Sequence, residues 1–275
     1  MNQMIETANG QMSGYFRKAN GQAPTLVFLE GFGGTNAFYN FKAVIDRLPR
    51  AYGILTLDYL GYGLSEITDA PRTIENIRNE LHTAIQGFHL SQILLFAHSI
   101  GGFLGFDYYL HHPATITGFI AIEPTTYEVL EAHPEENANF LKEAELFNRL
   151  SAEQKEKELM DVDREGQQNP YLSKKEAQID WEIAISKAFN KNLIDGTRRS
   201  MAILKTIRGK QITDELPTLI FSTPQRAKEF SQSNYLSQNK FSKLVSLEGN
   251  HYLHWGQPDP IVHETNAFID KLQQG

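Results

Sequence analysis

The chain has 275 residues, of which 41% are hydrophobic, and this suits one large domain or one domain with an insertion. The net charge of −7 and the lack of a dense Lys/Arg run argue against a nucleic-acid-binding surface or a polybasic membrane anchor. The chain contains no cysteine, which excludes a disulfide framework and a thiolate zinc site. MNQMIETANG at the start lacks a basic region followed by an apolar core, and no apolar run reaches about 20 residues. We therefore expect a cytoplasmic protein without a membrane span.

The chain is expected to open with an antiparallel meander. Short stretches with strand character at residues 4–8, 12–17 and 25–29 are separated by Asn9-Gly10 and Asn20-Gly21. Asn-Gly supplies the positive φ angles that a tight hairpin needs, so both pairs predict hairpin turns.

Beyond residue 29, apolar runs rich in β-forming residues alternate with helical stretches. The runs are GILTL from Gly53, QILLF from Gln92, GFIAI from Gly118, TLIFS from Thr218 and KLVSL from Lys243. The first of these lie roughly 25 to 40 residues apart, the spacing of βαβ units in a parallel sheet. Helices are expected over residues 36–48, 73–88, 100–110, 227–236 and 260–272, which would cover both faces of that sheet.

Residues 125–215 interrupt this alternation. Between Pro124 and Pro217 the sequence is polar, rich in Glu and Lys and favourable to helix, with no good strand. We interpret the segment as a helical insertion whose charged runs form solvated helix faces. Several of its apolar side chains are expected to face the domain beneath: Phe140, Leu146, Trp181, Ile183 and Phe189.

Ser99 lies where the strand that contains Phe96 should pass into the helix that begins near Ile100. Ala97 and Gly101 are small enough for the sharp turn on which a nucleophilic serine is exposed. The alternative is an ordinary helix N-cap, since A-x-S-x-G also arises by chance. A nucleophile would also need backbone N–H groups to stabilise an oxyanion, and the residue after the serine, Ile100, would supply one.

The glycine-rich stretch LEGFGGT would supply the second oxyanion donor, for which Phe32 N–H is our candidate. An alternative is a dinucleotide-binding loop with Asp58 as the ribose-binding acid. The G-x-G-x-x-G fingerprint, counted from Gly31, would have Asn36 in place of its last glycine, which disfavours this alternative.

The catalytic base is expected in EGNHYLHWGQPDP, just past the last predicted strand. Of its two histidines we choose His251 over His254, because His251 follows Gly249 in the tight exit from the strand. His-x-x-His here lacks the spacing and the acidic companion of familiar zinc sites, which disfavours a metal. Other histidines are interpreted as structural or exposed: His82, His89, His111, His112, His133 and His263.

Four stretches, TLVFLEGFGGT, LDYLGYGLSE, FAHSIGG and EGNHYLHWGQP, in this order and spacing resemble the α/β-hydrolase superfamily over nearly the whole chain. LDYLGYGLSE is similar to a D-x-x-G-x-G-x-S segment of many members, and HSIGG to their nucleophile elbow. The resemblance implies an α/β-hydrolase fold: a mostly parallel eight-stranded sheet, helices on both faces and a helical cap inserted after strand six. Residues 1–124 and 216–275 would form the core, and residues 125–215 the cap.

The resemblance also implies a triad of serine, acid and histidine, and two departures bear on the site. Glu30 stands where members commonly have His before the oxyanion-loop glycine, and its role stays open. The acid most often follows strand seven, but STPQRAKEFSQSN offers none before Glu229, which should lie inside the next helix. Some members place the acid at the end of strand six, where Glu123 stands, so Glu123 is our first candidate and Glu229 the second.

We therefore predict a serine hydrolase, without cofactor or metal, in which Ser99, Glu123 and His251 cleave a carboxylic ester of a small to medium, largely apolar molecule. Serine at the elbow disfavours dehalogenase and epoxide chemistry, and the lack of a His-Gly-Gly-Pro run favours an esterase over a peptidase. Aromatic residues expected near the pocket favour apolar acyl groups: Phe32, Phe38, Tyr39, Phe103 and Trp255. The alternative is a slow or non-catalytic small-molecule binder on the same fold.

Overall fold

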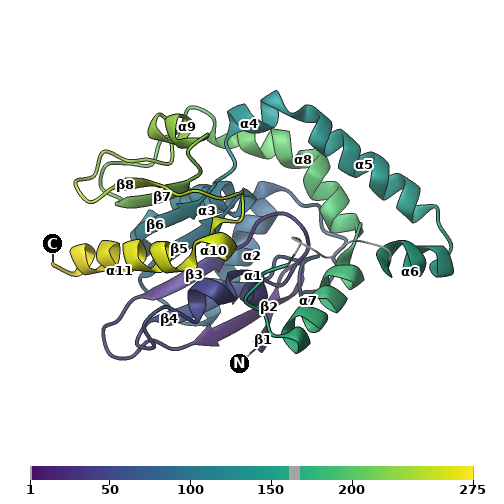
Figure 1. Ribbon diagram of the computed structural model, residues 1–275, viewed down its shortest axis with the longest axis horizontal. Helices are drawn as coiled ribbons and strands as arrows, with labels where there is room; N and C mark the ends of the chain where they lie inside the picture. Colours follow the sequence, from purple (N-terminus) through teal and green to yellow (C-terminus); the bar gives the residue numbers. More distant parts are fainter. Residues whose placement is uncertain (1, 161–167, 275) are drawn as a thin grey trace.

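The computed structural model describes residues 2–160 and 168–274. Its central sheet has eight strands in the order β1-β2-β4-β3-β5-β6-β7-β8 (Figure 1). The strands are β1 (Asn2–Thr7), β2 (Gly10–Arg17), β3 (Thr25–Leu29), β4 (Gly53–Leu57), β5 (Ile93–His98), β6 (Ile116–Ile122), β7 (Thr218–Ser222) and β8 (Lys243–Ser246). The strands from β4 to β8 in this order pair in parallel, whereas β2 is antiparallel to both of its neighbours. The mostly parallel sheet is the one that the sequence predicts.

The start of the chain departs from the predicted meander. β1 and β2 form the first expected hairpin, although its loop is Ala8-Asn9 and Gly10 already belongs to β2, and β2 pairs with β4 and not with β3. β4 lies between β2 and β3 in the sheet. The Asn20 N–H donates to the carbonyl oxygen of Ala51, two residues before β4, at 2.9 Å. The second hairpin prediction is therefore wrong, because Asn-Gly specifies a local turn and not the strand that pairs next.

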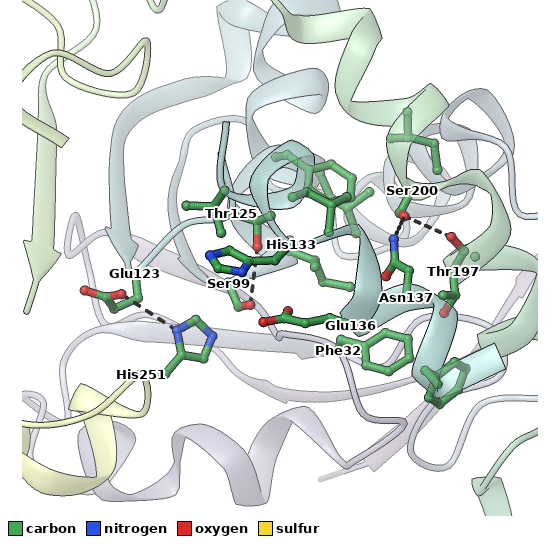
Figure 2. Close-up of a pocket in the computed structure, with 18 of the residues that line it drawn as sticks. Phe32, Ser99, Glu123, Thr125, His133, Glu136, Asn137, Thr197, Ser200 and His251 are labelled. Carbon is green, nitrogen blue, oxygen red and sulfur yellow. Dashed lines mark hydrogen bonds and ion pairs between the residues drawn. The ribbon is translucent and has the colours of Figure 1, made fainter. Parts of the chain in front are cut away.

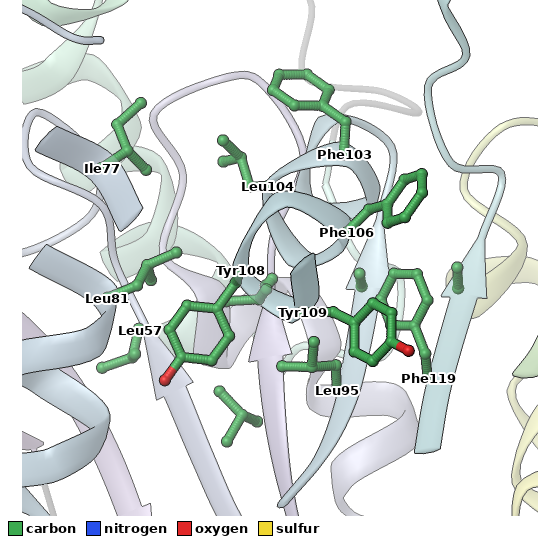
Figure 3. Packing of buried hydrophobic residues seen from close by; sticks show 14 of the residues in the cluster. Leu57, Ile77, Leu81, Leu95, Phe103, Leu104, Phe106, Tyr108, Tyr109 and Phe119 are labelled. Atoms are coloured by element: carbon green, nitrogen blue, oxygen red, sulfur yellow. The ribbon is translucent and has the colours of Figure 1, made fainter. Parts of the chain in front are cut away.

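Alternating strand residues divide the core between the two faces of the sheet. On one face, Leu95 and Phe119 pack with Leu81 of α2 and Leu104 of α3 (Figure 3). On the other face, residues such as Phe96 pack with α1 and α11. The helices around the sheet are α1 (Ala37–Ile45), α2 (Ile74–Gly87), α3 (Ile100–His111), α9 (Ala227–Ser231), α10 (Leu253–Gly256) and α11 (Pro258–Gln274).

Helices fill the described part of the chain between β6 and β7, which is called the cap segment below. They are α4 (Tyr127–Ala132), α5 (Pro134–Asn148), α6 (Ala152–Met160), α7 (Lys174–Lys187) and α8 (Lys191–Ile207). Figure 1 shows them grouped along one side of the molecule, with α5 beside α8. The segment is helical, as the sequence predicts, and the boundaries at residues 124/125 and 215/216 stay predictions.

The apolar side chains of the cap segment follow the predicted inward pattern in part. Trp181 and Ile183 are buried, and Phe140 packs against the buried core. Phe189 is half-buried, and its ring lies 5.5 Å from that of Phe140, within the cap segment itself. Leu146 is 54% exposed, so its inward prediction is wrong. It lies two residues beyond the buried Ala144, which is about 200° around an α-helix and therefore on the opposite face.

None of the helices within residues 2–160 and 168–274 combines the length and the apolarity needed to cross a bilayer.

Candidate active site

Ser99 occupies the turn between β5 and α3. Its φ of 53° and ψ of −123° belong to neither helix nor strand, a strained conformation typical of a strand-to-helix turn that exposes a nucleophile. A Cβ atom on Gly101 would lie 2.3 Å from the carbonyl oxygen of Leu29, so only glycine allows this close approach. The Ser99 side chain makes no capping hydrogen bond to α3, which removes the N-cap explanation of this serine.

Ser99 lines a pocket of about 850 Å³ between the ends of the strands and the cap segment (Figure 2). Glu123, at the end of β6, and His251, after β8, line the same pocket. The carboxyl ends of parallel strands meet at one edge of a sheet, which is why residues so far apart in sequence meet here.

The Glu123 carboxylate faces His251. Glu123 Oε2 lies 3.8 Å from His251 Nδ1 (Figure 2). Thr223 N–H donates to Oε1 at 2.6 Å, and Arg226 Nη1 donates to Oε2 at 2.9 Å. Burial by itself would raise the pKa of Glu123, but the nearby His251, the hydrogen bond from Thr223 and the charge of Arg226 hold it below its usual value. Glu123 is therefore an anion at neutral pH, beside the imidazole.

Glu229 faces Arg226 and not His251. It lies in α9, as predicted, and its Oε1 accepts from Arg226 Nη2 at 2.8 Å and from Thr126 Oγ1 at 2.6 Å. The second candidate acid thus contacts Glu123 only through Arg226. Sequence reasoning gave Arg226 no role, although its place in the loop after β7, where the acid commonly stands, was a signal.

Ser99 and His251 form no hydrogen bond in the described part of the chain. Ser99 Oγ instead lies 3.4 Å from Thr125 Oγ1, and the Thr125 N–H donates to the Ser99 carbonyl at 3.0 Å. The His251 side chain is 42% exposed. Sequence reasoning missed Thr125, whose only signal was its position two residues after Glu123.

The neighbouring histidines are buried and neutral. His254 Nε2 lies 2.8 Å from Asn40 Oδ1, and burial, with the nearby His251, lowers the pKa of His254 to about 3. His98 donates its Nε2–H to the carbonyl oxygen of His251 at 3.0 Å, since a carbonyl can only accept. In residues 2–160 and 168–274, no group of three or more His, Asp or Glu side chains is arranged to hold a metal ion.

The backbone N–H groups of Phe32 and Ile100 have no hydrogen-bond acceptor in the described part of the chain. Both residues line the pocket that holds Ser99. A Cβ atom on Gly31 would lie 3.1 Å from Ser99 Cβ, so the loop that carries Phe32 runs directly against the serine.

Two carboxylates in the neighbouring loops are structural. Asp58 accepts from Ala37 N–H at 2.8 Å with one oxygen and from Leu64 N–H at 2.9 Å with the other, which opposes a ribose-binding role. Glu30 is fully buried, and its Oε2 accepts from Thr35 Oγ1 at 2.8 Å. Burial raises the pKa of Glu30 well above its usual value, and Glu30 does not line the pocket.

The prediction of which aromatic residues line the pocket is partly wrong. Phe32 and Phe103 line the pocket that holds Ser99, but Phe38, Tyr39 and Trp255 do not. Phe38 packs with the core on the α1 face of the sheet, and Trp255 Nε1 donates to the carbonyl oxygen of Asn40 at 2.9 Å. Nearness in sequence to the glycine-rich loop did not determine the face on which α1 packs. Pocket aromatics that the sequence did not reveal are Tyr59, Tyr62 and Phe140, and His133 also lines the pocket.

A family model of the alpha/beta hydrolase fold matches residues 24–267. The chain belongs to the alpha/beta hydrolase fold family. Solved relatives show the same fold: Smu.1393c from Streptococcus mutans has a TM-score of 0.70 and 24% sequence identity over 98% of both chains. A putative epoxide hydrolase from Pseudomonas aeruginosa has a TM-score of 0.77 and 13% identity over 100% of this chain and 96% of that one.

A curated relative of this alpha/beta hydrolase is the (Lyso)-N-acylphosphatidylethanolamine lipase of Bos taurus. The two are 30% identical over 113 residues, which cover 40% of this chain and 32% of the lipase. The match therefore spans about a third of the length of that relative.

Proposed function

We propose that this alpha/beta hydrolase is a serine hydrolase that cleaves a carboxylic ester through an acyl-enzyme intermediate. The observation that carries the proposal is the ionised Glu123 beside His251 Nδ1, at 3.8 Å, in the pocket where Ser99 stands on a strained turn. A carboxylate in that position orients the imidazole and stabilises its charged form.

In the proposed reaction, Ser99 Oγ attacks the ester carbonyl carbon while His251 Nε2 takes the hydroxyl proton. The N–H groups of Phe32 and Ile100 donate to the oxyanion that forms. The C–O bond to the alcohol then breaks, and His251 returns the proton to the leaving oxygen. A water molecule, deprotonated by His251, attacks the acyl carbon. The bond between that carbon and Ser99 Oγ then breaks, and His251 returns the proton to Oγ as the acid is released.

The wall of the pocket supports a small to medium, largely apolar substrate. Several apolar side chains line it, including Leu60, Ile77, Phe103, Leu104, Leu130 and Ile203. An apolar lining favours the hydrocarbon part of an ester, and a volume of about 850 Å³ lies within the usual range of small-molecule pockets. A relative named as a lipase is consistent with an ester substrate.

The deciding test is intact-mass analysis after treatment with a fluorophosphonate, which reacts with an activated serine whatever the natural substrate. We expect one adduct on the wild-type protein and none on Ser99→Ala. Ser200→Ala is the matched control, because Ser200 lines the same pocket and should not carry the adduct. A folded wild-type protein without an adduct contradicts the proposal.

A slow or non-catalytic binder is the second candidate, favoured by the contact of Ser99 Oγ with Thr125 in place of His251. The pH dependence of ester hydrolysis separates the two. A catalytic triad loses rate in acid as its general base is protonated, whereas a slow or non-catalytic binder shows no such loss.

A further inference from the structure

The arginines that line the pocket are already paired with carboxylates. Arg72 donates to Glu80 with both terminal nitrogens, at 2.9 and 2.6 Å. Arg226 contacts both Glu123 and Glu229. Neither guanidinium is therefore left as a lone positive charge for an anionic substrate.

Glu136, by contrast, has no cationic partner in the described part of the chain. It is exposed, lies in the first turn of α5 and lines the pocket, and Figure 2 shows its carboxylate extending toward the side that holds Ser99. Glu135 in the same turn pairs with His133 at 3.1 Å. The partial positive charge of a helix N-terminus, about half a unit, is smaller than the full negative charge of Glu136, so this wall is net negative.

Asn137, the next residue of α5, adds a hydrogen-bond acceptor. Ser200 Oγ donates to the carbonyl oxygen of Thr197 at 2.9 Å, so it can only accept from Asn137 Nδ2, also at 2.9 Å (Figure 2). This assigns the amide nitrogen to Ser200 and leaves Asn137 Oδ1 without a donor in the described residues. Glu136 and Asn137 together present acceptors to the pocket.

Aromatic rings complete this side of the pocket. Phe32 is 39% exposed, and its ring packs edge to face on that of Phe140, with 4.9 Å between centroids. A cation is attracted to the face of an aromatic ring, so an exposed ring and an unpaired carboxylate favour the same kind of ligand.

We propose that Glu136, Asn137 and Phe32 form a subsite for an ammonium group of the substrate, so that the preferred ester carries an amine as well as an apolar part. This inference rests on the proposed serine hydrolase activity, because the subsite lies in the pocket that holds Ser99. A carboxylate or phosphate in the same position would be repelled by Glu136.

The test is protection of Ser99 from a fluorophosphonate by hexylammonium and by 1-hexanol, two molecules of equal length of which only the first is charged. At low ionic strength we expect hexylammonium to protect Ser99 at about fivefold lower concentration than 1-hexanol. This is the size of effect that one nearby charge has in a solvent-exposed site. Glu136→Gln should remove the difference. Glu143→Gln, the same change farther along α5 and outside the pocket lining, should keep it.

The outcomes separate the two proposals. Three results would overturn the ammonium subsite and leave the serine hydrolase proposal standing, each with Ser99 labelled by the fluorophosphonate. They are equal protection by hexylammonium and 1-hexanol, no protection by either, and a preference for hexylammonium that persists in Glu136→Gln. A folded protein that is not labelled contradicts the serine hydrolase proposal, and the subsite inference falls with it.

Discussion

Glu123 Oε2 lies 3.8 Å from His251 Nδ1, and the same oxygen accepts a hydrogen bond from Arg226 at 2.9 Å. Glu123 Oε2 thus contacts both the permanently charged Arg226 guanidinium and the His251 imidazole. Glu123→Gln keeps the shape of the side chain and removes the charge that would stabilise a protonated His251. We expect kcat/KM for ester hydrolysis to fall by about 100- to 10,000-fold, with the fold retained.

Glu229→Gln is the control for this variant, since Glu229 contacts Glu123 only through Arg226. A loss below about tenfold is expected, because the variant changes a contact of a neighbour and not the partner of His251. Unchanged turnover in Glu123→Gln together with a dead Glu229→Gln would show that the acid is assigned to the wrong residue.

The two histidines of the loop after β8 are expected to behave oppositely on substitution. His251→Gln should reduce kcat by about 1,000-fold or more and leave thermal stability nearly unchanged, because the side chain is 42% exposed. His254→Gln should keep most of the turnover and lower the melting temperature, because His254 is fully buried against Asn40. Steady-state kinetics and thermal unfolding of both variants check this, and the reverse pattern would make His254 the base.

Two helical glycines differ in the space around them. A Cβ on Gly101 would lie 2.3 Å from the backbone carbonyl of Leu29, whereas a Cβ on Gly196 would have no neighbour within 4 Å. Gly101→Ala should lower the free energy of unfolding by about 1–3 kcal/mol or more, because backbone cannot move aside easily. Gly196→Ala should raise it by about 0.5–1 kcal/mol, as alanine favours the helix. Urea unfolding measures both, and equal effects would contradict the tight turn at Ser99.

Asp180 of α7 should make the fold less stable as the pH rises. The side chain is 6% exposed, and its Oδ1 has no hydrogen-bond partner among the described residues. Burial, with the nearby Asp58, raises the pKa of Asp180 from 3.8 to about 7 against the opposing hydrogen bond from Asn36. The folded chain therefore holds a proton that the unfolded chain releases near pH 4, and stability falls between pH 4 and pH 7.

Asp180→Asn removes this titration. Its melting temperature should exceed that of the wild type by about 3 °C at pH 8, and the difference should vanish near pH 4. Differential scanning calorimetry at the two pH values is the measurement, with Glu143→Gln as an exposed control that should show no such pH dependence. A variant that is less stable at pH 8 would mean that the charged carboxylate is needed.

Local patterns were sufficient for much of this protein. The β-rich runs and the helical stretches between them predicted the parallel sheet, because hydrophobic periodicity and spacing are properties of short segments. The turn at Ser99 was predictable for the same reason: Ala97, Ser99 and Gly101 stand within five residues. The choice of Glu123 over Glu229 needed the family resemblance, since the local pattern places one at a strand end and the other in a helix but does not say which of them reaches His251.

Only the tertiary structure decided which distant groups meet. It separates β2 from β3 by β4, and turns Phe38, Tyr39 and Trp255 away from the pocket. It also brings Arg226 to Glu123 and Glu136 to the pocket of Ser99. Strand order and helix facing depend on packing between segments far apart in the chain, which local patterns do not encode. The sequence by itself therefore determined the sheet and the serine turn, and long-range packing determined the charges and the shape of the pocket around them.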